Sequence, residues 1–127
     1  MKNTTLQTEP LIYVAGPYSG TNGWIVELNI RQAEERAYRI ARQGGSPICP
    51  HSMTRFFNGT LTYERWIQIT LNMLTGCDAC EVDLKNWYDS PGTRGEVEFS
   101  KDHGIPVLSK PQQTQDFIDA WKAKHLG

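Results

Sequence analysis

Apolar positions along the chain follow two alternating spacings, which predict short strands separated by helices. Residues 11–16 (LIYVAG) form an apolar run that ends in glycine, as is typical of a buried parallel strand. From about residue 29 to residue 43 the apolar side chains instead recur at helical spacing, and Gly44 supplies a stop signal. The further elements predicted in this way are strand 46–50, helix 63–74, strand 77–84, helix 95–102, strand 105–109 and helix 114–126.

This alternation predicts an α/β fold. Strands connected through helices form a parallel sheet whose two faces are covered by the helices, with right-handed crossovers. A chain of 127 residues is long enough for one hydrophobic core. We therefore expect a single-domain Rossmann-like or flavodoxin-like three-layer sandwich with a parallel sheet over residues 11–127. Residues 1–10 are expected to be a flexible N-terminal segment.

Composition and charge limit the classes of partner. The formal net charge of −1 produces no field that would recruit a nucleic acid polymer or an anionic membrane. No apolar run approaches the roughly 20 residues that a membrane helix requires. The polar N-terminus "MKNTTLQTEP" contains no signal-peptide core, so we expect a cytoplasmic protein.

The three cysteines do not indicate a metal or redox site. Cys77 and Cys80 have the C-x-x-C spacing found in zinc and redox motifs, but the second pair that a zinc site needs is missing. The motif also leads into a strand instead of opening a helix, which leaves these roles as minor alternatives. We expect no cofactor and no disulfide framework.

Unusual residues follow three of the predicted strands. In a parallel sheet, ligands bind beyond the carboxyl ends of the strands, at the point where the strand order reverses. The residues expected at this crevice are Gly16, Pro17, Tyr18, Ser19 and Gly20 after the first strand, His51 after the second, and Trp87, Ser90, Gly92 and Glu96 after the third.

Two carboxylates follow the glycine-rich turn in "DSPGTRGEVEF" (residues 89–99), at the expected start of a helix. An acid in a first turn meets the positive end of the helix dipole and free N–H groups, which would hold Glu96 ionised as a nucleophile requires. The same position also suits an acid that only stabilises the helix, which is the common role of acids in first turns. The residues alone leave both interpretations open.

An ordered set of motifs resembles one known family. "YVAGPYSG", "PICPH", a helix with tryptophan before "CDA", then "W..S.G...E" and "GIPV" occur in this order over about residues 11–108. This set resembles the nucleoside 2-deoxyribosyltransferase-like family, which includes deoxynucleoside 5′-monophosphate N-glycosidases. The resemblance implies cleavage or transfer at an N-glycosidic bond through a glutamate nucleophile, without a cofactor, in a homodimer or a dimer of dimers.

The resemblance also assigns roles to single residues. It implies that the nucleophile is Glu96, eight residues before Gly104, and that the hydroxyl group of Tyr13 touches its carboxylate. Ser90 matches a serine that helps to hold the 5′-phosphate in the monophosphate-cleaving branch, where nucleoside transferases have an aspartate. The turn "GPYSG" would add backbone N–H groups for the same phosphate, although it needs glycine for the turn itself.

Several positions depart from the family or stay open. The monophosphate branch has an arginine where Ser19 stands, and Arg31, Arg55 and Arg94 are the candidates to replace it. His51 suits either a sugar or base contact or a bond to nearby backbone, and Trp87 suits either a core position or stacking on a base.

The largest departure is Thr70, which stands where relatives place an aspartate that manages the proton of the leaving base. A threonine cannot serve as a carboxylic acid, and Asp83, at the end of an oddly polar strand, is the candidate replacement. This departure supports a second hypothesis, a non-catalytic protein that senses or sequesters a nucleotide. A third hypothesis, an assembly protein using only the fold, leaves the converging loops unexplained.

Overall fold

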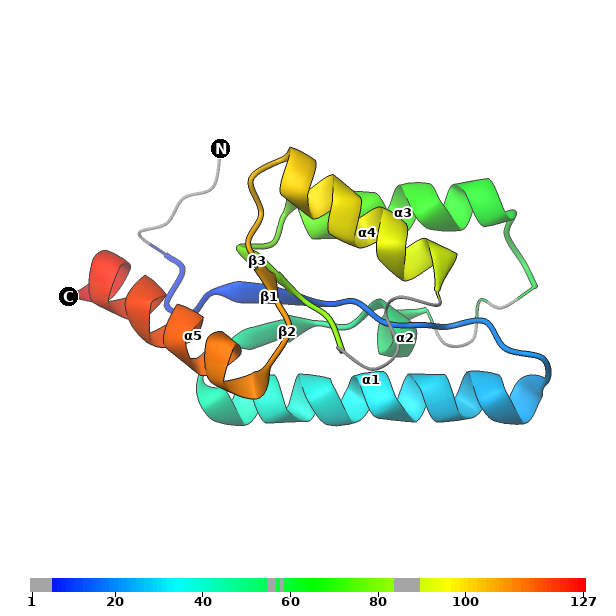
Figure 1. The fold of residues 1–127 in the computed structure, drawn as a ribbon, viewed down its shortest axis with the longest axis horizontal. Coiled ribbons are helices and arrows are strands. Elements are labelled where there is room, and N and C mark those ends of the chain that lie inside the picture. Colours follow the sequence, from blue (N-terminus) through cyan, green and yellow to red (C-terminus); the bar gives the residue numbers. More distant parts are fainter. Residues whose placement is uncertain (1–5, 55–56, 58, 84–89) are drawn as a thin grey trace.

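The computed structural model describes residues 6–54, 57, 59–83 and 90–127, which form an α/β domain (Figure 1). The described elements are β1 (Leu11–Val14), α1 (Gly23–Gln43), β2 (Ser46–Ile48), α2 (Pro50–Met53), α3 (Tyr63–Thr75), β3 (Ala79–Glu81), α4 (Pro91–Asp102), β4 (Val107–Leu108) and α5 (Pro111–Leu126). The strands make a four-stranded sheet in the order β2-β1-β3-β4, and every described pair is parallel. The predicted α/β fold with a parallel sheet is confirmed.

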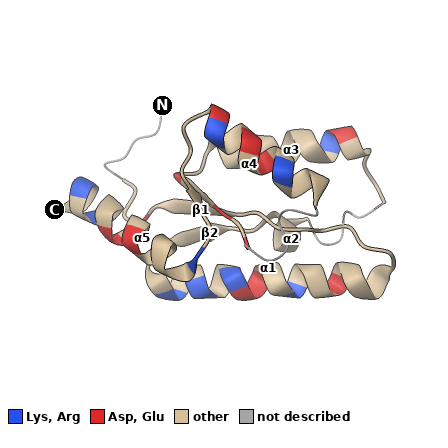
Figure 2. Ribbon diagram, viewed as in Figure 1, with Lys and Arg blue, Asp and Glu red and all other residues tan. Residues whose placement is uncertain are grey.

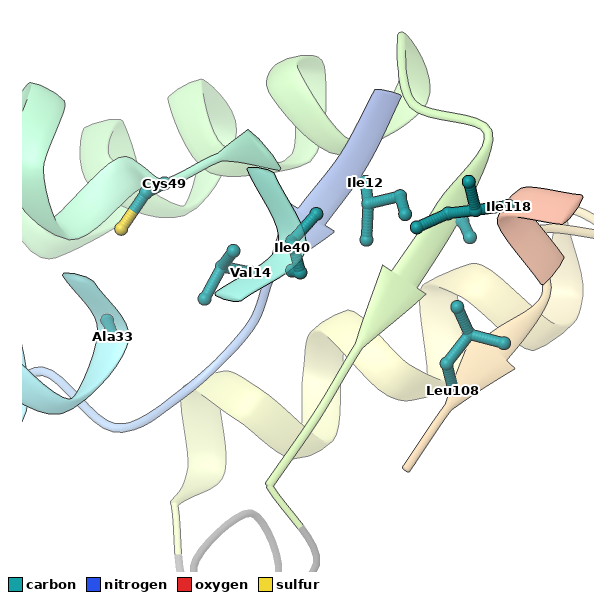
Figure 3. Packing of buried hydrophobic residues seen from close by; sticks show 8 residues of the cluster. Ile12, Val14, Ala33, Ile40, Cys49, Leu108 and Ile118 are labelled. Carbon is teal, nitrogen blue, oxygen red and sulfur yellow. The ribbon is translucent and has the colours of Figure 1, made fainter. Parts of the chain in front are cut away.

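The helices cover the sheet in two layers. Figure 1 shows α1 and α5 along one face of the sheet and α3 and α4 along the other. Alternate residues of β1 serve the two layers, because successive side chains of a strand point to opposite faces. Ile12 and Val14 pack in a cluster with residues of α1 and α5, which Figure 3 shows from close by. Tyr13 and Ala15 pack in a second cluster with residues of α3 and α4.

The strand order places a crevice beside β1. The chain crosses from β1 to β2 on one side and then returns past β1 to β3 on the other, so the order reverses between β1 and β3. The loops that leave the carboxyl ends of these two strands therefore diverge and leave room for a ligand. Register pairs Val14 of β1 with Glu81 of β3, so both strands end at the same level.

Two helices begin earlier than the sequence pattern predicts. Helix α1 starts at Gly23 instead of about residue 29, with the side chain of Asn22 accepting a hydrogen bond from the N–H of Ile25. Helix α4 starts at Pro91 instead of Gly95, with Ser90 as its N-cap. Asn22 and Ser90 are both residue types favoured as helix caps, and in α4 proline also takes the first helical position, which suits it. The glycines of these segments are typical of loops, and they hid both helix starts in the sequence pattern.

Smaller differences concern connecting segments. The region after β2, expected to be a long loop, contains the short helix α2, and α5 begins three residues before its predicted start. Of the expected flexible segment, residues 1–5 lie outside the described residues. In the remainder, Gln7 donates to the carboxylate of Asp78, Glu9 accepts from Ser46, and Pro10 is fully buried.

Charged side chains of both signs are interspersed along the helices (Figure 2). Within the described part of the chain, none of the helices has the length and apolar character needed to cross a membrane.

Candidate functional site

A cavity of about 770 Å³ opens beyond the carboxyl end of β1. Its walls come from the loop after β1, the first half of α1, α2, α3 and the start of α4. The described residues that line it are Tyr13, Gly16, Pro17, Tyr18, Ser19, Ile25, Leu28, Asn29, Gln32, Pro50, His51, Thr54, Tyr63, Trp66, Ile67, Thr70, Ser90, Pro91, Gly92, Thr93 and Glu96. The cavity lies where the sequence predicts a crevice, and most of the residues expected there line its walls.

Tyr13 and Glu96 form a hydrogen-bonded pair in this cavity. The phenol of Tyr13, from the middle of β1, donates to Oε2 of Glu96 on α4. The contact expected between these two side chains is present. Glu98 lies on the exposed side of α4 and does not line the cavity. The structure therefore separates the two carboxylates of the glycine-rich turn, and only Glu96 can meet a ligand in this cavity.

Burial controls the charge state of the pair. It raises the pKa of Glu96 to about 7, and the hydrogen bond from Tyr13 opposes this rise. Burial also raises the pKa of Tyr13 well above its usual range, and the neighbouring negative charge of Glu96 adds to the effect. At neutral pH the tyrosine is therefore protonated and donates, while the carboxyl group exchanges a proton readily.

The sequence-based account of Glu96 was wrong on one point. Because α4 begins at Pro91, its first turn contains no acid, and Glu96 lies in the second turn. The helix dipole acts mainly within the first turn, so it does not hold this carboxylate ionised as expected. Burial dominates and favours the protonated form instead.

Ser90 caps α4 at the edge of the cavity. Its hydroxyl oxygen accepts from the N–H of Thr93 at 3.3 Å and from the hydroxyl group of Thr93 at 2.9 Å. A hydroxyl oxygen that accepts two bonds keeps its own proton to donate elsewhere. Next to it, a methyl group added at Gly92 would meet no atom within 4 Å, so the helix start is open to a ligand.

The loop after β1 is held from outside by side chains. Nδ2 of Asn29 donates to the carbonyl oxygens of Tyr18 and Ser19, at 3.1 and 3.2 Å. Nε2 of His51 donates to the carbonyl oxygen of Pro17 at 2.9 Å. The ring of His51 also lies 5.7 Å from that of Tyr18, measured between centroids.

His51 is buried, and its Nδ1 atom has no hydrogen-bond partner among the described residues. Burial lowers the pKa of His51, so the ring is neutral at pH 7. His51 therefore contacts nearby backbone, through its bond to Pro17. A role for His51 in binding a sugar or base stays a prediction.

Thr70 occupies the wall beside Tyr13. Its hydroxyl group donates to the carbonyl oxygen of Ile67 at 3.1 Å and lies near the phenol of Tyr13, whose pKa it tends to lower. The candidate to replace the missing acid, Asp83, is described but is not part of the cavity wall. The expected role of Asp83 in place of this acid stays a prediction.

Gly20, Arg31 and Arg94 are described but are not among the residues that line the cavity. Gly20 lies outside its wall, and a Cβ atom there would come within 2.4 Å of the Ile25 side chain, so glycine is required by packing. Trp87 and Arg55 lie outside the described residues. Arg94 is exposed, and Arg31 pairs with Glu27 at 3.2 Å, so neither lines the cavity.

The sequence pattern missed two groups of wall residues. Ile25, Leu28, Asn29 and Gln32 share one face of α1, and the late predicted start of this helix hid their spacing. Tyr63 and Trp66 supply aromatic surface from α3, and Trp66 also packs near Phe57 with ring centroids 6.1 Å apart. Their spacing of three residues on a predicted helix was the available signal.

Comparison with known proteins places the chain in a family. No curated protein matches the sequence. A domain of unknown function, DUF7768, matches residues 10–110. The matched region runs from the residue before β1 to the residue before α5, and it includes every described residue of the cavity wall. The chain therefore belongs to the DUF7768 family.

Proposed function

We propose that the cavity binds a deoxynucleoside or nucleoside 5′-monophosphate, and that Glu96 attacks its sugar to cleave or transfer the N-glycosidic bond. The observation that carries this proposal is the Tyr13–Glu96 pair inside a cavity of about 770 Å³, with a capped helix start beside it. A carboxylate with a raised pKa in a cleft, oriented by a second side chain, is a common arrangement at catalytic sites.

The reaction proceeds in two displacements. The ionised carboxylate of Glu96 forms a bond to the anomeric carbon, and the base leaves with the electrons of the broken C–N bond. Water or a second base then displaces Glu96 from the sugar. Tyr13 keeps the carboxylate oriented before the attack, because its phenol donates to one oxygen and leaves the other oxygen for the sugar.

The departing base must take up a proton, and the cavity limits where this proton comes from. Thr70 lies at the position of the missing acid and has no acidic proton to give at neutral pH. Asp83 is outside the cavity wall. Glu96 is the one carboxylic acid among the described wall residues, so we take water in the open cavity as the proton source. Such a source suits substrates whose bases leave readily, and it predicts slow turnover.

The start of α4 suits the phosphate group. The hydroxyl group of Ser90 has a proton to donate, and the helix start at Gly92 is open. A helix N-terminus attracts anions because its first N–H groups have no partner within the helix and the helix dipole is positive at that end. The described wall contains no lysine or arginine, so the donors described at this site are neutral, and the candidate Arg55 lies outside the described residues.

The second candidate function is a non-catalytic nucleotide-binding protein that senses or sequesters its ligand. Two observations favour it: threonine stands at position 70, and burial raises the pKa of Glu96 to about 7. A half-protonated carboxyl group is a weak nucleophile but a good hydrogen-bond partner for a sugar hydroxyl.

A panel of nucleosides and their 5′-monophosphates, in deoxy and ribo forms, separates the two functions. Each compound is incubated with the protein, free base is measured by chromatography, and binding is measured in parallel by calorimetry. Release of base from at least one bound monophosphate supports the enzyme. Tight binding without release over many hours supports the sensor, and a panel without binding contradicts both.

A further inference from the structure

A buried acid at the end of β3 lies beside the start of the loop after β1 (residues 15–19), which lines the cavity. Glu81 is 1% exposed, although it carries a carboxylate. Its Oε1 accepts from Nε of Arg36 at 3.2 Å and from Nη2 of Arg39 at 2.7 Å, and Oε2 accepts from Thr114 of α5. Both oxygens are thus satisfied, as a buried charge requires.

Arg36 does more than pair with this acid. Its Nη1 donates to the carbonyl oxygen of Ala15 at 2.7 Å, and its Nη2 donates to the carbonyl oxygen of Glu81 at 2.8 Å. These carbonyl groups lie at the ends of β1 and β3, where the N–H of Ala15 also donates to Glu81. The planar guanidinium group therefore fixes the direction in which β1 enters the cavity loop.

Arg39 offers a matched comparison on the same helix. It contacts both carboxylate oxygens of Glu81, and within the described part of the chain it also donates to Oε1 of Gln43 on α1. Arg36 and Arg39 thus share the ion pair, while Arg36 also holds the loop backbone. Gly16 reflects this closeness, because a Cβ atom there would lie 3.2 Å from Nη1 of Arg36.

Arg36 acts together with Asn29. The two residues are seven positions apart, which is about two helical turns, so they lie on one face of α1. Asn29 holds the carbonyl oxygens of Tyr18 and Ser19, and Arg36 holds that of Ala15. Between them, His51 of α2 donates to Pro17. Side chains, instead of a strand or helix ladder, therefore define this stretch of cavity wall.

We infer that α1 is the positioning element of the cavity: Arg36, fixed by Glu81, and Asn29 hold the backbone of residues 15–19 by its carbonyl oxygens and so set the shape of the wall. This inference concerns how the loop is held, and it stands whether or not Glu96 attacks a sugar.

The side chain of His51 reports on the loop without any ligand. Its ring is bonded to Pro17, in the middle of residues 15–19, and packed against Tyr18. The charged groups that act on it are Arg36 and Glu34, both from α1. The variant Arg36→Lys keeps the positive charge but loses the planar guanidinium group. A change in the pKa of His51 in this variant therefore reports movement of the loop and not loss of charge.

The experiment compares Arg36→Lys, Arg39→Lys and Asn29→Ala with the wild type by histidine side-chain NMR across pH, with thermal unfolding measured in parallel. The exposed His103 and His125 serve as references in the same spectra. In Arg36→Lys and Asn29→Ala the pKa of His51 should rise by about half a unit or more toward its ordinary value, because the ring gains contact with water. In Arg39→Lys it should stay at the wild-type value, although both arginine variants lose thermal stability.

A purely structural role for Arg36 predicts a different pattern. The two arginine variants would then lose stability alike, and the pKa of His51 would either stay at its wild-type value in both or shift equally in both. Either result overturns the inference. If Arg36→Lys does not fold, Asn29→Ala decides alone, because the described hydrogen bonds of Asn29 go to the loop and not to the buried ion pair. An unchanged pKa of His51 in Asn29→Ala contradicts the inference, and a raised pKa supports it.

Discussion

The hydroxyl group of Tyr13 donates a hydrogen bond to Glu96 and thereby joins the centre of the sheet to the second turn of α4. Burial raises the pKa of this carboxyl group to about 7, and the bond from Tyr13 is the opposing influence. The pair therefore sets the pH range in which Glu96 is ionised, and this range is measurable.

The first prediction concerns the pH dependence of this pair. In the proposed reaction only the ionised carboxylate of Glu96 attacks, so base release should increase with pH through about 7 and then level off. Tyr13→Phe removes the bond that lowers the pKa of Glu96, so the midpoint should move to higher pH. The pH–rate profiles of both proteins test this, and a midpoint that moves to lower pH contradicts the account.

The second prediction concerns stability. The carboxyl group has its ordinary pKa of 4.5 when unfolded and about 7 when folded, so its contribution to stability is full below 4.5 and is lost as pH rises through 7. Glu96→Gln removes this pH-dependent loss of folding stability, because glutamine does not titrate. Relative to wild type, the variant should gain stability between pH 5 and pH 8 by about 1 kcal/mol or more, since one pKa unit corresponds to about 1.4 kcal/mol.

Urea denaturation of both proteins at pH 5 and pH 8 measures this difference, with Glu98→Gln as the control because Glu98 is exposed on the same helix. A difference that is equal at both pH values means that Glu96 is not desolvated in the folded protein.

The third prediction concerns the phosphate. If Ser90 and the start of α4 hold it, a 5′-monophosphate should bind more tightly than its nucleoside by about 1.5 to 3 kcal/mol, which is roughly ten- to a hundredfold in Kd. Ser90→Asp should reverse this preference, because it places a negative charge against the phosphate.

Both Asp and Asn cap helices as well as Ser, so Ser90→Asn is the control for the cap. It should keep the preference for the monophosphate, and all three proteins should unfold at similar temperatures. Calorimetric titration with both ligands provides the test. Equal affinity of the wild type for nucleoside and monophosphate removes the phosphate site and leaves a nucleoside-specific reaction.

The fourth prediction concerns assembly, for which we expect a homodimer or a dimer of dimers. Four aromatic residues of the sequence, Phe56, Phe57, Trp66 and Trp121, are candidates for a contact surface. In the structure Trp121 is buried, Trp66 lines the cavity and Phe56 lies outside the described residues. Phe57 is 48% exposed, and Trp24 and Tyr63 are exposed by 60% and 63%. Light scattering at micromolar concentration tests this, and a monomer contradicts it.

The sequence was most informative where spacing alone decides the structure. The apolar run of residues 11–16 and the helical spacing up to Gln43 predicted β1 and the end of α1 correctly, because burial on a sheet or a helix face requires those periods. The parallel order of strands and helices then placed the cavity, since ligands of such sheets bind beyond the carboxyl ends.

The sequence was least informative where tertiary contacts decide the outcome. The glycines at 92 and 95 suggested a loop, yet the Ser90 cap and Pro91 begin the helix there, which moves Glu96 out of the first turn. The third strand also carries Glu81, whose role the sequence pattern does not indicate. The partners of Glu81 lie 42 or more residues away on α1 and 33 away on α5, and no local pattern indicates them.

The central claim is that Glu96 is the nucleophile, and the comparison of Glu96→Gln with Glu98→Gln tests it most directly. Both glutamates lie on α4, but only Glu96 lines the cavity. With the monophosphate that the wild type cleaves best, Glu96→Gln should lose base release by several powers of ten and keep its Kd, whereas Glu98→Gln should match the wild type. Wild-type turnover by Glu96→Gln would contradict the account.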